Sequence, residues 1–201
     1  MTTLLSTEEK KQDMENNPGK NCPRKAGFSL VELVVVLGLL SILAAIAVPS
    51  FTKQIPDYRL KSAARDLYSN MQKARIRAIK SNKEWALVFD DTDDKYYLCS
   101  DKGGDDSWSG TGDNTVEEVI YLAGYQSGVK YGHGKATSSP AGGSFPADGI
   151  SYNSNVVTFN PSGTGSPGYV YLENEKNNTY AVGSLTSGVI RLLIWNGSEW
   201  E

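Results

Sequence analysis

The sequence predicts an α+β protein in which one long N-terminal helix precedes an antiparallel β-sheet. Residues 28–48 are almost unbroken hydrocarbon, and a helical period of apolar residues continues to about residue 82. From residue 83 the pattern changes to short apolar and aromatic runs separated by turn residues. A helix followed only by strands is typical of a fold in which the helix covers one face of the sheet.

Composition argues against several functional classes. The 201 residues carry a net charge of -3, which does not favour a nucleic-acid binder driven by bulk charge. Two cysteines and a single histidine leave little material for metal sites or histidine-dependent catalysis. We therefore expect no enzyme activity, no catalytic or metal-binding residue and no cofactor.

Residues 28–48 are predicted to cross a membrane. About 21 helical residues span roughly 31 Å, which is enough for a bilayer core. Lys20, Arg24 and Lys25 precede this segment, and no basic residue follows before Lys53. The positive-inside bias then places the N-terminus in the cytoplasm and the C-terminal part outside it.

A cleaved secretory signal is the competing interpretation. Residues 45–47 fit a small-x-small cleavage pattern, which would leave Val48 at the N-terminus of a secreted β-domain, one that could bind carbohydrate. The apolar stretch is longer than an ordinary signal core, and Glu32 lies near its start. The N-terminal residue of the mature protein separates the two hypotheses.

Residues 25–33, with the sequence KAGFSLVEL, carry a resemblance to a known signal. They resemble the class III signal of type IV pilins and type II secretion pseudopilins. The resemblance implies that a prepilin peptidase removes residues 1–27 by cutting between Gly27 and Phe28. It also implies N-methylation of Phe28, a role for Glu32 as the fifth mature residue in filament assembly, and a helix kink at Pro49.

Glu32 also has a physical interpretation. A carboxylate in hydrocarbon is costly unless it finds a partner. In a filament of parallel helices, the amine of a neighbouring Phe28 would supply that partner and set the axial register. The alternative is that Glu32 simply lies at the membrane interface.

The predicted leader is long and polar, and Met14 offers an internal start. Removal of residues 1–27 also removes Cys22, which leaves only Cys99 and excludes an intramolecular disulfide. Cys99 is expected to be a small strand residue.

The second half of the helix, up to residue 82, is amphipathic. Its apolar residues follow a 4-3-4-3-4 spacing that lines one face and is expected to pack on the sheet. We call this set the seam: Leu60, Ala64, Leu67, Met71, Ala74 and Ala78. Pro49 and Pro56 mark expected kinks. The basic residues between positions 59 and 83 are expected to form a solvated face with their acidic neighbours.

Residues 83–201 are predicted to form the globular head. Seven strands are expected, at 84–89, 96–99, 119–122, 156–159, 169–172, 180–182 and 189–195. Long loops are expected at 101–115 and 132–149, where glycine, serine and threonine gather. Asp90, Asp91, Asp93 and Asp94 are expected to form a solvated turn rather than a calcium loop. His133 is expected to be an exposed loop residue, Trp195 a core residue and Trp200 part of an exposed tail.

Four further segments, 63–67, 73–82, 157–163 and 188–191, resemble the GspH/FimT family of minor pseudopilins. The resemblance implies a type IV pilin-like fold, anchorage in the inner membrane with a periplasmic head, and assembly into a pseudopilus that pushes folded proteins toward the outer membrane. The implied partners are other pseudopilins or pilins, the prepilin peptidase/methyltransferase and the inner-membrane assembly platform.

A FimT-like minor pilin of a type IV pilus is the alternative within this architecture. DNA-binding members carry a Gly-Arg-x-Arg pattern, of which residues 188–191 retain only Arg191. The predicted leader holds five basic and four acidic residues, so its removal shifts the net charge from -3 to -4. DNA is therefore not expected as a partner.

Overall fold

The computed structural model describes residues 27–201. Of the predicted leader, only Gly27 lies within this part; Met14 and Cys22 lie outside it. The chain divides into two units that meet between Ile46 and Ala47.

The long helix α1 comprises Leu30–Ser81, close to the predicted 28–82. It ends where Asn82 adopts a left-handed backbone with φ 51°, a conformation that asparagine tolerates better than most residues. The Lys83 N–H closes the last turn by donating to the Ala78 carbonyl at 3.3 Å. The helix continues through Pro49 and Pro56, and the kink at Pro49 stays a prediction.

The predicted seam is buried. Leu60, Leu67 and Met71 are at most 1% exposed, and the alanines at positions 63, 64, 74 and 78 are buried with them. Alanines let the helix axis approach the sheets closely, while the leucines and the methionine fill the remaining space. The amphipathic pattern therefore identified the packing face correctly.

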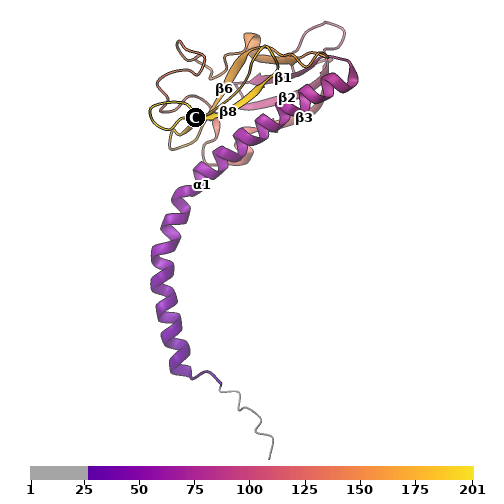
Figure 1. Ribbon diagram of the computed structural model, residues 1–201. Coiled ribbons are helices and arrows are strands. Elements are labelled where there is room, and N and C mark those ends of the chain that lie inside the picture. Colours follow the sequence, from indigo (N-terminus) through magenta and orange to yellow (C-terminus); the bar gives the residue numbers. More distant parts are fainter. Residues whose placement is uncertain (1–26) are drawn as a thin grey trace, which may run out of the picture. The chain divides into compact units, whose positions relative to one another are not determined.

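Eight strands follow α1, in two antiparallel sheets (Figure 1). The first sheet has the order β3-β2-β1-β5 and the second the order β4-β6-β7-β8. Their bounds are β1 Trp85–Asp90, β2 Lys95–Asp101, β3 Thr115–Tyr121, β4 Lys130–Tyr131, β5 Val156–Phe159, β6 Gly168–Glu173, β7 Thr179–Ser184 and β8 Ile190–Ile194. Two short 3-10 helices, η1 Leu122–Tyr125 and η2 Asn153–Asn155, interrupt the connections.

The α+β class is confirmed, and each of the seven predicted strands overlaps an observed one. Three details differ from expectation. The strands divide between two sheets rather than one, β4 was missed, and β3 begins four residues earlier than predicted. A two-residue strand has no periodicity to detect, and the first half of β3 is polar because it lies at a sheet edge.

One main core lies between the seam and the inner faces of both sheets. Strand alternation decides which side chains enter it. In β1, Trp85, Leu87 and Phe89 belong to this core, whereas Val88 belongs to a separate cluster on the outer face. Loop residues cover part of both outer faces: Trp108 packs over the first sheet, and Phe145 and Trp200 pack over the second.

Candidate functional site

The predicted cleavage point lies just before α1. Gly27, Phe28 and Ser29 have no regular secondary structure, and the Phe28 side chain is 77% exposed. The Ser29 carbonyl accepts the first bond of the helix, from the Leu33 N–H at 3.1 Å. The peptide bond between Gly27 and Phe28 is therefore outside any helical or sheet ladder, as access by a peptidase requires.

Glu32 occupies the first turn of α1 and is exposed. A carboxylate there is favoured by the partial positive charge of the helix N-terminus. Within residues 27–201, Glu32 makes no hydrogen bond or ion pair.

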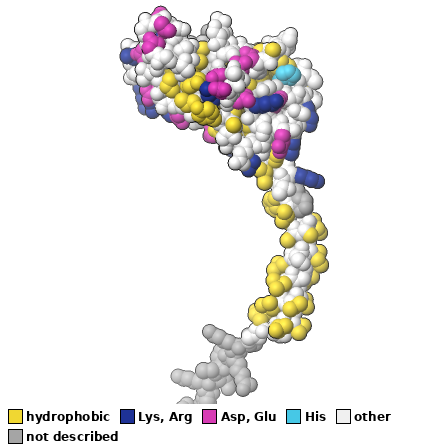
Figure 2. Space-filling model, turned by 180° about the vertical axis from the view of Figure 1, so that it is seen from behind, with side chains coloured by type: hydrophobic (Ala, Val, Ile, Leu, Met, Phe, Trp, Pro, Cys, Tyr) yellow, Lys and Arg dark blue, Asp and Glu magenta, His cyan; other side chains and the backbone are white. Residues whose placement is uncertain are grey.

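The N-terminal half of α1 presents hydrophobic side chains to its surroundings. Leu30–Val48 has a mean hydropathy of 2.8, and none of its 18-residue apolar window is buried. Figure 2 shows the hydrophobic side chains exposed along this part of the helix. By length and composition this segment is able to cross a membrane, although a signal sequence near the N-terminus would pass the same test.

Asp57 joins the second half of α1 to the turn between β6 and β7. Its Oδ1 accepts hydrogen bonds from Asn174 Nδ2 at 2.9 Å and from Asn178 Nδ2 at 2.7 Å. Lys176 Nζ donates to Asp57 Oδ2 at 2.9 Å. Partial burial raises the pKa of Asp57, but the hydrogen bonds from Lys176, Asn174 and Asn178 outweigh it and leave the pKa below its usual value. No local sequence pattern predicted these contacts of Asp57, because its partners lie 117 to 121 residues further along the chain.

The basic face of α1 is partly neutralised by the first sheet. Lys73 pairs with Glu118 at 2.6 Å and Arg77 with Glu117 at 3.7 Å. Arg75 Nε donates to the Gly163 carbonyl at 2.8 Å. These contacts agree with the expected solvated face with acidic neighbours.

The acidic residues at positions 90–94 and Cys99, which were considered as chemical sites, have structural roles in the head. Asp90 accepts the backbone N–H groups of Thr92 and Asp93, and Lys95 pairs with Asp90 and Asp93, so the acidic cluster is a hairpin turn. Cys99 is a buried strand residue, as expected, and burial raises the pKa of its thiol to about 11. A thiol held in this protonated state is a poor nucleophile.

Two expectations about exposure are wrong. His133 is half-buried and stacks on Phe145, with ring centroids 4.1 Å apart. Trp200 is also half-buried, because the C-terminal residues fold back on β8 and the indole Nε1 donates to the Ser138 carbonyl at 2.6 Å. Both residues hold the long loop 132–149 against the outer face of the second sheet, a contact that no local pattern shows.

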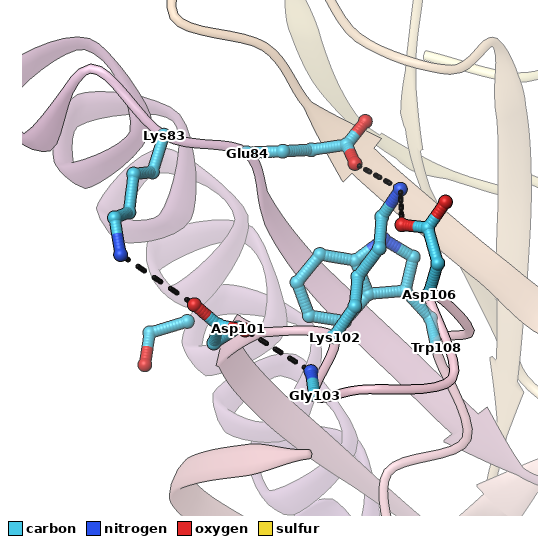
Figure 3. A pocket seen from close by; sticks show the side chains of 8 residues that line it. Lys83, Glu84, Asp101, Lys102, Gly103, Asp106 and Trp108 are labelled. Carbon is cyan, nitrogen blue, oxygen red and sulfur yellow. Dashed lines mark hydrogen bonds and ion pairs between the residues drawn. The ribbon is translucent and has the colours of Figure 1, made fainter. Parts of the chain in front are cut away.

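A polar pocket of about 280 Å³ opens beside the loop between β2 and β3 (Figure 3). Lys102 extends over the Trp108 ring, 5.9 Å from its centroid, and pairs with Glu84 at 3.0 Å and with Asp106 at 3.2 Å. Trp108 Nε1 is buried and has no hydrogen-bond partner within residues 27–201. Sequence reasoning missed Trp108, whose surroundings depend on the folding of the loop.

The N-terminal segment defines the class of protein. Residues 22–48 match the model of the prokaryotic N-terminal methylation motif. This match covers Gly27, Phe28 and the whole apolar span, and it confirms the resemblance to the pilin-type signal.

The head and the second half of α1 define the family. Residues 63–188, more than half of the chain, match the family model described as type II transport protein GspH. The chain therefore belongs to the GspH family, and the predicted resemblance is confirmed.

Solved structures show a distant likeness. Two solved structures of EpsH, a minor pseudopilin of the type II secretion system of Vibrio cholerae, are 16% and 15% identical to this chain. They cover 68% and 72% of it, and 97% and 99% of their own length, with TM-scores of 0.46 and 0.47. No curated protein matches the chain at a significant level.

Proposed function

We propose that this protein is a minor pseudopilin that helps a type II secretion pseudopilus to push folded proteins across the outer membrane. The observation that carries the proposal is the exposed apolar half of α1, which has no packing partner in the described chain. Such a surface needs lipid before assembly and neighbouring helices afterwards. Membership of the GspH family supports the same role.

The N-terminal processing follows from this role. A prepilin peptidase/methyltransferase cuts between Gly27 and Phe28 and methylates the new Phe28 amine. The helix then anchors the protein in the inner membrane, with its N-terminus cytoplasmic and its head in the periplasm. Other pseudopilins and the inner-membrane assembly platform are its partners, and Glu32 pairs with the Phe28 amine of a neighbouring subunit.

The first experiment determines the N-terminus of the mature protein by mass spectrometry. We expect N-methylated Phe28 when the peptidase is present and an uncut chain when it is absent. A mature N-terminus at Val48 would contradict the proposal, because the apolar segment would then be a cleaved secretory signal.

The second experiment tests Glu32 in assembly. Glu32→Ala should leave cleavage intact and reduce the fraction of the protein in sheared filaments at least about tenfold. The reason is that it removes the ion pair with the neighbouring Phe28 amine, which is worth at least about 1.4 kcal/mol when desolvated. Asp91→Ala, at an exposed position of the β1–β2 turn, is the matched control. Equal filament fractions in the two variants would argue against the role of Glu32.

A further inference from the structure

A groove of about 620 Å³ lies on the outer face of the first sheet, within the head. Its walls come from the loop between β2 and β3, from η2 and from the segment before β6. The lining includes Asp106, Trp108, Asn153, Val156, Thr158 and Ser166. We call it the Trp108 groove, and it lies on the opposite face of the sheet from the seam.

Asn114 fixes the Trp108 wall. This asparagine is only 9% exposed. Its Nδ2 donates to the carbonyls of Lys102 at 2.6 Å and Ser107 at 2.8 Å, and its Oδ1 accepts the N–H groups of Ser109 and Gly110, both at 2.8 Å. The residues on both sides of Trp108 are therefore held by one side chain, which keeps the indole in place before any ligand arrives.

The opposite wall is also fixed by the fold. Ser154 and Asn155 both adopt left-handed backbone conformations, with φ 53° and 57°. Thr158 Oγ1 and Ser166 Oγ form a hydrogen bond of 2.8 Å across the floor. The Asn153 side chain is exposed and makes no hydrogen bond within residues 27–201. The groove thus holds ordered hydroxyls together with an amide that is free to bind.

The chemistry of the lining selects the kind of ligand. No lysine or arginine of the described chain lines the groove, and its charged lining residue, Asp106, is an acid that pairs with Lys102 at 3.2 Å, so the groove offers no free positive charge to an anion. A purely apolar ligand is disfavoured because it would leave the exposed Asn153 amide without a partner. Trp108 lines both this groove and the pocket of Figure 3, whereas Lys102, which lies 5.9 Å from the indole centroid, lines only the pocket. Trp108 therefore offers apolar ring surface to the groove, while Asp106 and Asn153 offer acceptors and donors for hydroxyl groups.

We propose that the Trp108 groove binds a neutral oligosaccharide. A sugar ring presents an apolar face that packs on the indole and hydroxyls at its edge that bond to Asp106 and Asn153. The Asp106 carboxylate pairs with Lys102 through Oδ1, and its other oxygen has no partner within residues 27–201. The lining residues of the groove all lie in the head, outside the apolar segment Leu30–Val48, so binding is measured without any step of membrane insertion or filament assembly.

The test uses the full chain in a detergent without a sugar headgroup, because a glycoside detergent would compete. Calorimetry and tryptophan fluorescence measure binding of chitotriose and cellotriose, two neutral probes. A hyaluronan tetrasaccharide and a Gly-Ser-Gly-Ser peptide are the anionic and peptide comparisons. We expect saturable binding of at least one neutral probe with a change in fluorescence. Binding of neither neutral probe, or binding of only the anion or the peptide, would overturn the proposal.

Variants locate the binding. Asn153→Ala and Trp108→Phe should each weaken binding of the neutral probe at least about tenfold, because each removes a direct contact with the probe. Asn153→Ala removes no hydrogen bond of the described chain, so it should fold normally even if Trp108→Phe does not. Trp200→Phe, outside the groove, should bind like the wild type. Affinity unchanged in Asn153→Ala, or lowered equally in Trp200→Phe, would overturn the assignment.

Discussion

Gly188 sits where the turn before β8 meets the turn after β5. Its backbone has φ 75°, and a Cβ added there would lie 1.9 Å from the Gly163 carbonyl oxygen. The same oxygen accepts the hydrogen bond from Arg75 of α1. Gly188 and Gly163 thus allow a close approach that attaches the helix to both turns.

Gly188→Ala is expected to destabilise the head strongly. A left-handed alanine costs about 1–2 kcal/mol by itself, and the collision with Gly163 adds strain to it. Gly142→Ala is the matched control, because Gly142 has a similar φ of 80° with no atom within 4 Å of the added Cβ. Thermal unfolding followed by circular dichroism should show a clearly larger loss for Gly188→Ala. Equal losses of thermal stability in the two variants would mean that the chain accommodates the Cβ at position 188 beside the Gly163 carbonyl at no extra cost.

Asp57 predicts a pH dependence of stability. Its pKa is lower in the folded protein than in the unfolded chain, so its contribution is present above the unfolded pKa of about 4 and is lost as the pH falls through the folded value. The melting temperature of Asp57→Asn should therefore lie below that of the wild type at pH 7, and the difference should shrink toward pH 3. The effect should be modest, because the side chain is 43% exposed. Asp91→Asn should show little difference at either pH.

At the scale of the element, α1 has two surfaces with different partners. Its N-terminal half is apolar on all sides, whereas its second half buries the apolar residues of the seam and is mixed, with exposed residues such as Ile76 and Ile79, on its other faces. The sequence predicted both halves because a run of hydrocarbon and a 3.6-residue period are local signals. It did not predict the contacts of Asp57 or Arg75, whose partners come from turns more than 80 residues away.

Burial of the seam predicts that substitutions on the two faces of the second half of α1 differ strongly in their effect on stability. Leu67 is 0% exposed and Ile76 is 48% exposed. Leu67→Ala should lower the free energy of unfolding by about 2–5 kcal/mol, because it removes buried contacts and leaves a cavity. Ile76→Ala should cost less than about 1 kcal/mol. Chemical denaturation with a common slope for both variants measures the difference, and similar losses would contradict the assigned packing face.

At the scale of the whole molecule, membrane anchorage depends on the apolar half of α1. Leu39 lies near the middle of Leu30–Val48. An arginine at that depth costs about 3 kcal/mol, so Leu39→Arg should move much of the protein out of the carbonate-resistant membrane fraction. Tyr58→Arg, at an exposed position outside this segment, should stay in the membrane fraction. Membrane retention of both variants would argue against a single spanning segment.

The sequence by itself determined the class and the family. The cleavage motif, the apolar span, the seam and most strands are local patterns of residue type and spacing, and the matches at residues 22–48 and 63–188 confirm the resemblance that they carried. Gly27, Phe28 and Glu32 lie within six consecutive residues, so the sequence could propose them as one N-terminal site, and their roles in cleavage and assembly stay predictions.

Only the tertiary structure decided how the head is assembled. It divided the strands between two sheets, joined Asp57 to the β6–β7 turn, and half-buried His133 and Trp200 where the loop 132–149 packs against the second sheet. It also placed Trp108 beside Asn153, 45 positions later in the chain. Strand partners and loop positions follow from which distant surfaces are buried together, and that choice is made by the whole chain rather than by any local period.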